Sequence, residues 1–203
     1  MKLYYIHDPM CSWCWAFRPV WQQLKKQLPT AIGVSYVLGG LAPDSHSPMQ
    51  LGLQRQIQQH WHTIQQRVPG TMFNFEFWQH NIPRRSTYPA CRAVIAAKEQ
   101  GEIYEDAMIL AIQQAYYLQA RNPSDDDVLL ACAASLDLDM QYFQEVFYAA
   151  ACKQKLLSDI QFSRRLHVHG FPSLVLDCDD VLHPIDIHYT NSDSILRAIE
   201  LRV

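Results

Sequence analysis

Hydrophobic and polar positions follow two different periods along this chain. Short apolar runs rich in β-branched and aromatic residues stand near both ends, and they predict strands at 3–6, 32–38, 173–178 and 181–187. Elsewhere apolar residues recur every three or four positions, which is the repeat of one helix face. This pattern predicts helices at 12–28, 47–68, 86–101, 103–118, 124–132, 143–150, 156–166 and 192–201.

The order of these elements divides the chain into two parts. Residues 1–41 read strand–helix–strand, and residues 169–203 read strand–strand–helix. Residues 42–168 carry helical patterns and essentially no strand signal. Joined together, the two end segments have the element order of a thioredoxin-like fold. The sequence therefore predicts an α/β protein: a thioredoxin-like domain from 1–41 and 169–203, with 42–168 as a large all-helical insertion between the second and third strands.

Composition and charge narrow the classes of partner. The 203 residues are 49% hydrophobic and 18% charged, which is ordinary for a globular protein with a sizeable core. A net charge of −3 with scattered Lys and Arg offers no basic surface for nucleic acid or for a membrane. No apolar run approaches the roughly 18 residues of a membrane-spanning helix. The opening residues read as a strand rather than as a secretion signal, which predicts a cytoplasmic protein.

Six cysteines are present, and only one pair of them is closely spaced. Cys11 and Cys14 form a C-x-x-C at the turn between the first strand and the first helix. The other four are isolated, and we expect buried thiols, with a second redox pair among them as the alternative: Cys91, Cys132, Cys152 and Cys178. A cytoplasmic setting also disfavours a framework of structural disulfides.

A C-x-x-C at a helix start is suited to thiol–disulfide exchange. Unpaired N–H groups and the helix dipole favour a thiolate at Cys11, and Cys14 follows one helical turn later. We therefore expect Cys11 to attack a substrate disulfide and Cys14 to resolve the mixed disulfide. The alternative is a zinc knuckle, but that site needs a second ligand pair, and the chain has no other C-x-x-C and no C-x-x-H. The sequence favours redox chemistry and predicts no metal.

The segment 8–17, DPMCSWCWAF, resembles the active-site segment of the DsbA-like family of thioredoxin-fold proteins, in particular its cytoplasmic FrnE-like branch. The resemblance extends to 89–93 (PACRA) and to 168–172 (VHGFP). It implies a thioredoxin fold with an inserted helical domain and redox activity with Cys11 as the nucleophile. It also implies that Pro172 is a cis-proline facing Cys11, and that the backbone of Phe171 pairs with the substrate chain.

Two features depart from the secreted members of that family. The chain shows no secretion signal, and the residues between its cysteines are Ser12 and Trp13, where histidine is usual. Without that positive partner for the thiolate, we do not expect a strongly oxidising pair. Related 2-hydroxychromene-2-carboxylate isomerases and kappa-class glutathione transferases keep the fold but generally lack the second cysteine. Cys14 therefore argues against that branch and leaves glutathione binding open.

Several aromatic and imidazole groups near the motif have more than one interpretation. We expect Trp13 to contact substrate beside the thiol. A charged imidazole of His7, His167 or His169 would lower the pKa of Cys11, although each also fits a purely structural role. The apolar segment 68–78 either lines a peptide groove or packs the insertion against the thioredoxin-like domain.

Together these features predict a thiol–disulfide oxidoreductase acting on protein or small thiol and disulfide substrates. It would need no cofactor, with glutathione as an optional co-substrate. The alternatives are a glutathione-dependent transferase or isomerase that acts on a small molecule, and a non-enzymatic binding module that uses exposed aromatic side chains.

Overall fold

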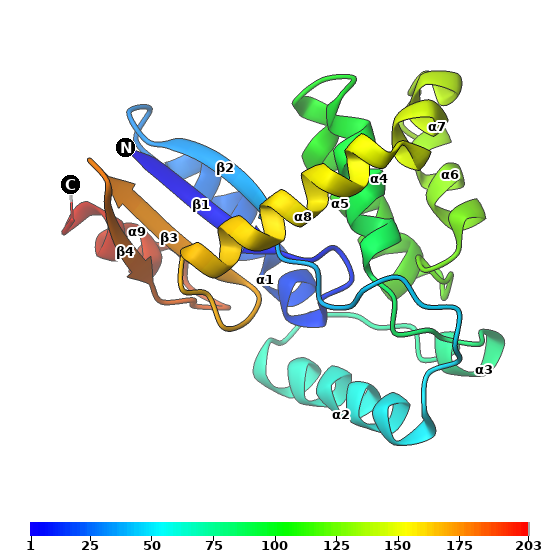
Figure 1. The fold of residues 1–203 in the computed structure, drawn as a ribbon. Helices are drawn as coiled ribbons and strands as arrows, with labels where there is room; N and C mark the ends of the chain where they lie inside the picture. The colour runs from blue at the N-terminus through cyan, green and yellow to red at the C-terminus, as the bar shows by residue number, and fades with distance from the viewer. Residues whose placement is uncertain (203) are drawn as a thin grey trace.

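The two ends of the chain meet in one four-stranded sheet. The structure is a computed structural model that describes residues 1–202. Its strands are β1 (Lys2–His7), β2 (Gly33–Leu38), β3 (Ser173–Cys178) and β4 (Val181–Ile185). They lie in the order β2-β1-β3-β4, with β2 parallel to β1 and with both β3 and β4 antiparallel to their neighbours (Figure 1). This topology confirms the predicted fold class.

Helices account for the rest of the regular structure in residues 1–202. They are α1 (Ser12–Gln27), α2 (Leu51–Arg67), α3 (Phe77–His80), α4 (Tyr88–Lys98), α5 (Ile103–Tyr117), α6 (Asp126–Ala134), α7 (Met140–Tyr148), α8 (Ala150–Arg165) and α9 (Ser192–Glu200). The periodicity predicted eight of these and missed α3, which is a single turn too short to show a repeat. In this part of the chain no helix is both long and apolar enough to cross a bilayer.

Helices cover both faces of the sheet. On one face α1 and α9 bury Phe17, Trp21 and Ile195 against β1 and β3. On the other face the last turns of α8 place Phe162 and Leu166 against the strands. Figure 1 shows α8 running from the sheet to the distal helices. Because an α/β sheet needs apolar cover on both sides, α8 completes the thioredoxin-like layer.

The insertion has its own core around α4. Nine of the eleven residues of α4 are buried, and α5, α6, α7 and α8 pack around it. The part of α8 from residue 150 to residue 160 contributes Cys152, Leu156 and Ile160 to this core. One helix thus belongs to both cores, whereas the sequence-based division at residue 168 assigns all of α8 to the insertion. The boundary between the thioredoxin-like domain and the insertion stays a prediction.

A polar cluster around Asp106 fastens α1 to the insertion. The Asp106 carboxylate on α5 accepts from Gln22 Nε2 (2.8 Å) and Tyr36 Oη (3.1 Å) and pairs with Arg18 (3.1 Å) and Lys25 (3.3 Å). Burial acts to raise the pKa of Asp106, but Arg18 and its other partners hold it below its ordinary value. The cluster joins the insertion to the helix that begins beside Cys11.

Candidate active site

Cys11 occupies the N-cap position of α1. The chain leaves β1 at His7, turns through a Cys11 N–H to Asp8 carbonyl bond of 3.0 Å, and enters the helix with Cys11 in an extended conformation (φ −83°, ψ 117°). No side chain caps the free N–H groups at this end, and no acidic residue lies in the first turn. These N–H groups therefore remain available to stabilise negative charge at the Cys11 sulfur.

The proline loop faces Cys11 from the other end of the chain. The Cys11 thiol donates to the Phe171 carbonyl at 3.5 Å, and the Phe171–Pro172 peptide bond is cis. The Phe171 ring lies against the end of β2, where a Cβ on Gly39 would stand 1.9 Å from a ring carbon. A side chain at position 39 would therefore displace the Phe171 ring. The structure thus brings Cys11, Phe171 and Pro172 together, as the sequence predicts.

Cys14 lies behind Cys11 and out of contact with solvent. Its side chain is 0% exposed, against 7% for Cys11. Burial raises the pKa of the Cys14 thiol well above its ordinary value, and the Cys11 sulfur beside it adds to the rise. Of the two thiols, only Cys11 is placed to meet a substrate first.

Three tyrosines surround the cysteine pair. Burial raises the pKa of Tyr5, Tyr117 and Tyr189, and the two thiols add to the rise in each case. All three are therefore neutral phenols that bring no positive charge to the thiols. The Tyr117 hydroxyl donates to the Met10 carbonyl at 2.8 Å and so fixes the residue that precedes Cys11.

Asp8 connects the cysteine turn to two other segments. Its buried carboxylate accepts from the N–H of Met10 (2.8 Å), the N–H of Leu41 (2.7 Å), the Thr87 hydroxyl (2.6 Å) and the Cys91 thiol (3.6 Å). Burial raises the pKa of Asp8, and these donors oppose the rise. The sequence indicates Asp8 only as part of the D-P-x-C pattern and predicts no role for its carboxylate.

Replacing Asp8 with Asn is expected to destabilise the fold by about 1–3 kcal/mol. An amide turns one acceptor oxygen into a donor, so at least one of the buried donors loses its partner. Urea unfolding at pH 7 measures the change, with Asp186→Asn as the control because Asp186 is exposed. Equal stability of Asp8→Asn and the wild type would contradict the role of this carboxylate in fastening the turn.

A groove of about 320 Å³ opens beside Cys11. Its floor is the cysteine turn with Trp13, and Phe171 closes one side. The facing wall comes mainly from α2, through Leu53, Gln56, Ile57, His60 and Trp61. Trp13 is half-buried and not freely exposed, because its ring packs on Tyr189 with centroids 5.0 Å apart. The sequence offered no reason to single out His60, which becomes a groove residue only when α2 folds back over the motif.

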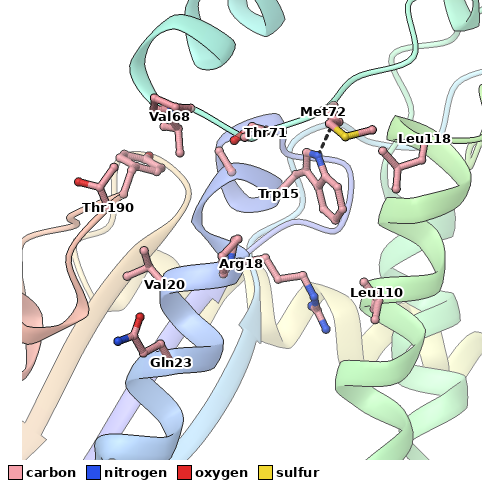
Figure 2. Close-up of a pocket in the computed structure, with 15 residues that line it drawn as sticks. Trp15, Arg18, Val20, Gln23, Val68, Thr71, Met72, Leu110, Leu118 and Thr190 are labelled. Carbon is pink, nitrogen blue, oxygen red and sulfur yellow. Dashed lines mark hydrogen bonds between the residues drawn. The ribbon is translucent and has the colours of Figure 1, made fainter.

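A larger, mainly apolar cavity of about 690 Å³ lies along the outer side of α1 (Figure 2). Figure 2 shows Trp15 pointing toward Met72, whose carbonyl accepts from the indole N–H at 3.0 Å. Residues 68–72 line this cavity. Val68, Phe73 and Phe77 are buried in an aromatic cluster with α1 and α5. The segment 68–78 therefore packs the insertion against α1 and also forms one cavity wall.

His7, His167 and His169 do not supply a positive charge to Cys11. His7 is fully buried, and burial together with the Arg18 charge lowers its pKa to about 3, so its imidazole is neutral at pH 7. His167 and His169 are exposed and do not line the groove at Cys11. The interpretation of His7 as a charged neighbour of the thiol is wrong, because the ring is stacked inside the aromatic core beside Tyr5.

The remaining cysteines form no disulfide within residues 1–202. All six thiols are free, and Cys91, Cys132 and Cys152 are buried, while Cys178 is partly exposed. Within residues 1–202, no three His, Cys, Asp or Glu side chains gather as metal ligands would. That the C-x-x-C holds no metal stays a prediction.

The fold and this site are those of a thioredoxin-type protein, and comparison with known families agrees. The thioredoxin family profile matches residues 4–186, so the chain belongs to the thioredoxin family. A Nitrosomonas europaea protein designated a protein disulfide isomerase superposes with a TM-score of 0.87 at 27% identity, over 98% of this chain and 96% of that one. The cytosolic disulfide reductase DsbM from Pseudomonas aeruginosa gives a TM-score of 0.82 at 24% identity, over 100% and 98%. The predicted DsbA-like thioredoxin-fold family is confirmed.

Other relatives that match the same region are described as adapter proteins rather than as redox enzymes. The ClpXP adapter protein SpxH of Halalkalibacterium halodurans is 22% identical over 187 residues, which cover 89% of this chain and 60% of that protein. This chain thus spans about 60% of the length of the curated relatives that it matches. The relatives therefore carry two descriptions, a redox enzyme and a protein adapter.

Proposed function

We propose that this protein is a dithiol–disulfide oxidoreductase in which Cys11 is the nucleophile and Cys14 the resolving thiol. The observation that carries the proposal is the position of the Cys11 sulfur. It stands at the uncapped start of α1, 3.5 Å from the Phe171 carbonyl, with Cys14 buried behind it. A bound substrate at the groove would meet this sulfur and this carbonyl together.

The exchange proceeds in two steps. The Cys11 thiolate attacks one sulfur of the substrate disulfide, forms a mixed disulfide and releases the first substrate thiolate, which takes up a proton. Cys14 then loses its proton and attacks the Cys11 sulfur, which releases the second substrate thiol and leaves a Cys11–Cys14 disulfide. The substrate gains two electrons and the protein loses two. Once Cys11 no longer donates to it, the Phe171 carbonyl is free to accept an N–H from the substrate backbone.

The residues between the two cysteines bear on the direction of electron flow. They are Ser12 and Trp13, so no histidine stands between the thiols, and we do not expect a strongly oxidising pair. We expect a reduction potential nearer that of thioredoxin, about −270 mV, than that of DsbA, about −120 mV. Equilibration of the protein with a series of glutathione ratios measures it.

Alkylation of the reduced protein tests the proposal. Cys11 is expected to react with iodoacetamide faster than free cysteine does at the same pH, because free helix N–H groups favour negative charge at its sulfur, and the Cys11→Ser variant loses this fast phase. A rate no faster than that of free cysteine removes the chemical basis of the proposal. Mass spectrometry of the alkylated peptide identifies the thiol that reacted.

The SpxH relatives favour a second candidate, an adapter that binds a protein partner without redox turnover. Under that candidate the Cys11→Ser protein keeps its biological task, whereas the oxidoreductase loses it. A cytoplasmic location stays a prediction, and the fold match to the cytosolic DsbM is consistent with it. Its substrates would be protein disulfides or glutathione disulfide, since one DsbM structure contains GSH.

A further inference from the structure

Two arginines flank the reactive cysteine. Arg85, just before α4, lines the groove at Cys11, and Arg67, the last residue of α2, lines a second depression of about 310 Å³. Trp13 and Phe171 line both hollows, which are therefore adjacent. A molecule whose sulfur meets Cys11 in the first hollow could extend into the second, with one arginine in each.

Neither arginine is neutralised within residues 1–202. Both are exposed, and neither forms an ion pair or a side-chain hydrogen bond in this part of the chain. No Asp or Glu lines either hollow. Arg85 also lies near enough to Tyr116 for its charge to oppose the rise that burial causes in the pKa of that groove tyrosine. Arg18, Arg84 and Arg92, in contrast, are each paired with an aspartate.

We propose that Arg67 and Arg85 select a small disulfide that carries a carboxylate on each side of its reacting sulfur. Glutathione disulfide has this chemistry, because each cysteine lies between two carboxylate-bearing ends. The volume of each hollow lies near the lower limit of small-molecule sites, about 300 Å³. One half of glutathione disulfide, which is a tripeptide, therefore fits these hollows better than the surface of a folded protein does. A guanidinium also binds a carboxylate through two parallel hydrogen bonds, which orients the sulfur as well as attracting the anion. This inference rests on the proposed function and names the residues that select its substrate.

The reaction with this substrate balances without a further cofactor. The reduced protein and one glutathione disulfide give two glutathione thiols and the Cys11–Cys14 disulfide. The S–S bond of glutathione disulfide breaks, the S–S bond between Cys11 and Cys14 forms, and the two protein thiol protons pass through solvent to the two products. The arginines take no part in the electron transfer. They act as specificity-determining residues that bind the carboxylates.

Single-turnover oxidation of the reduced protein tests the inference. The second-order rate constant is measured with glutathione disulfide, with its fully esterified form, and with neutral hydroxyethyl disulfide. For glutathione disulfide, Arg67→Ala and Arg85→Ala are each expected to lower the rate constant about tenfold, and the double variant about a hundredfold. For the two disulfides that lack carboxylates, the variants should lose no more than about twofold in rate. Arg55→Ala is the matched control, since Arg55 is an exposed α2 arginine outside both hollows.

The outcomes separate this inference from the function on which it rests. Equal loss of rate with glutathione disulfide and with the two disulfides that lack carboxylates, or no loss with any of the three, overturns the selection of carboxylates by these arginines. So does an Arg55→Ala loss equal to that of Arg67→Ala or Arg85→Ala, because general surface charge would then explain the effect. A wild-type protein that reacts with none of the three disulfides overturns the oxidoreductase function itself. Selective loss with glutathione disulfide, weakening as salt is raised, supports the inference.

Discussion

Replacing Cys14 with serine is expected to arrest the protein as a mixed disulfide and to lower turnover by a factor on the order of 10³ or more. Cys11 still attacks, but no second thiol stands behind it to release the substrate. A positioned intramolecular thiol has an effective concentration far above the millimolar thiol that solution supplies, so external rescue is slow. The high pKa of Cys14 keeps this thiol protonated until the mixed disulfide forms in front of it.

Intact-protein mass spectrometry after reaction with glutathione disulfide detects the arrested adduct on Cys11. Cys178→Ser serves as the control, since Cys178 is partly exposed and lies in β3, outside the groove. Full turnover by Cys14→Ser would contradict the dithiol mechanism. It would instead support the glutathione-dependent transferase or isomerase, which uses one cysteine.

Acid is expected to destabilise the fold through His7 by up to about 4–5 kcal/mol between pH 6.5 and pH 3. The folded-state pKa of His7 is about 3, whereas an unfolded histidine titrates near 6.5, so the unfolded chain takes up the proton first. The stability is therefore complete above pH 6.5 and is lost as the pH falls toward 3. Burial is the main cause, Arg18 adds to it, and Asp106 opposes it. The magnitude follows from about 1.4 kcal/mol for each pKa unit.

The His7→Phe variant is expected to remove this part of the pH dependence. Neither ring nitrogen of His7 has a hydrogen-bond partner in the structure, and the ring stacks on Tyr5 with centroids 5.1 Å apart, so a phenyl ring keeps the packing. Urea unfolding from pH 7 to pH 4 measures the difference between the two proteins. Burial raises the pKa of Asp8, which favours the folded state as the pH falls, and this effect is the same in the wild type and in the variant. Parallel stability curves for wild type and variant would show that His7 is not buried as a neutral ring.

Local sequence predicted the elements that carry the chemistry. The strand before Cys11, the helix after it and the strand after Pro172 each follow from a short pattern, because their apolar positions repeat within a few residues. The pattern could not predict that α8 covers the sheet, since an apolar helix face does not reveal which partner it meets. Nor could it predict α3, which is one turn long.

The sequence by itself determined the α/β class, the C-x-x-C at a helix start and the proline loop before a strand, because these depend on neighbouring residues. The tertiary structure decided which residues from distant segments contact the cysteine motif and the proline loop. Asp8 is joined to Leu41 and Thr87 only when the insertion folds onto the turn. Arg67 and Arg85 come to flank Cys11 only because α2 and the start of α4 pass over the motif. These contacts join segments that are far apart in the chain, and no local pattern of residue types predicts such a contact.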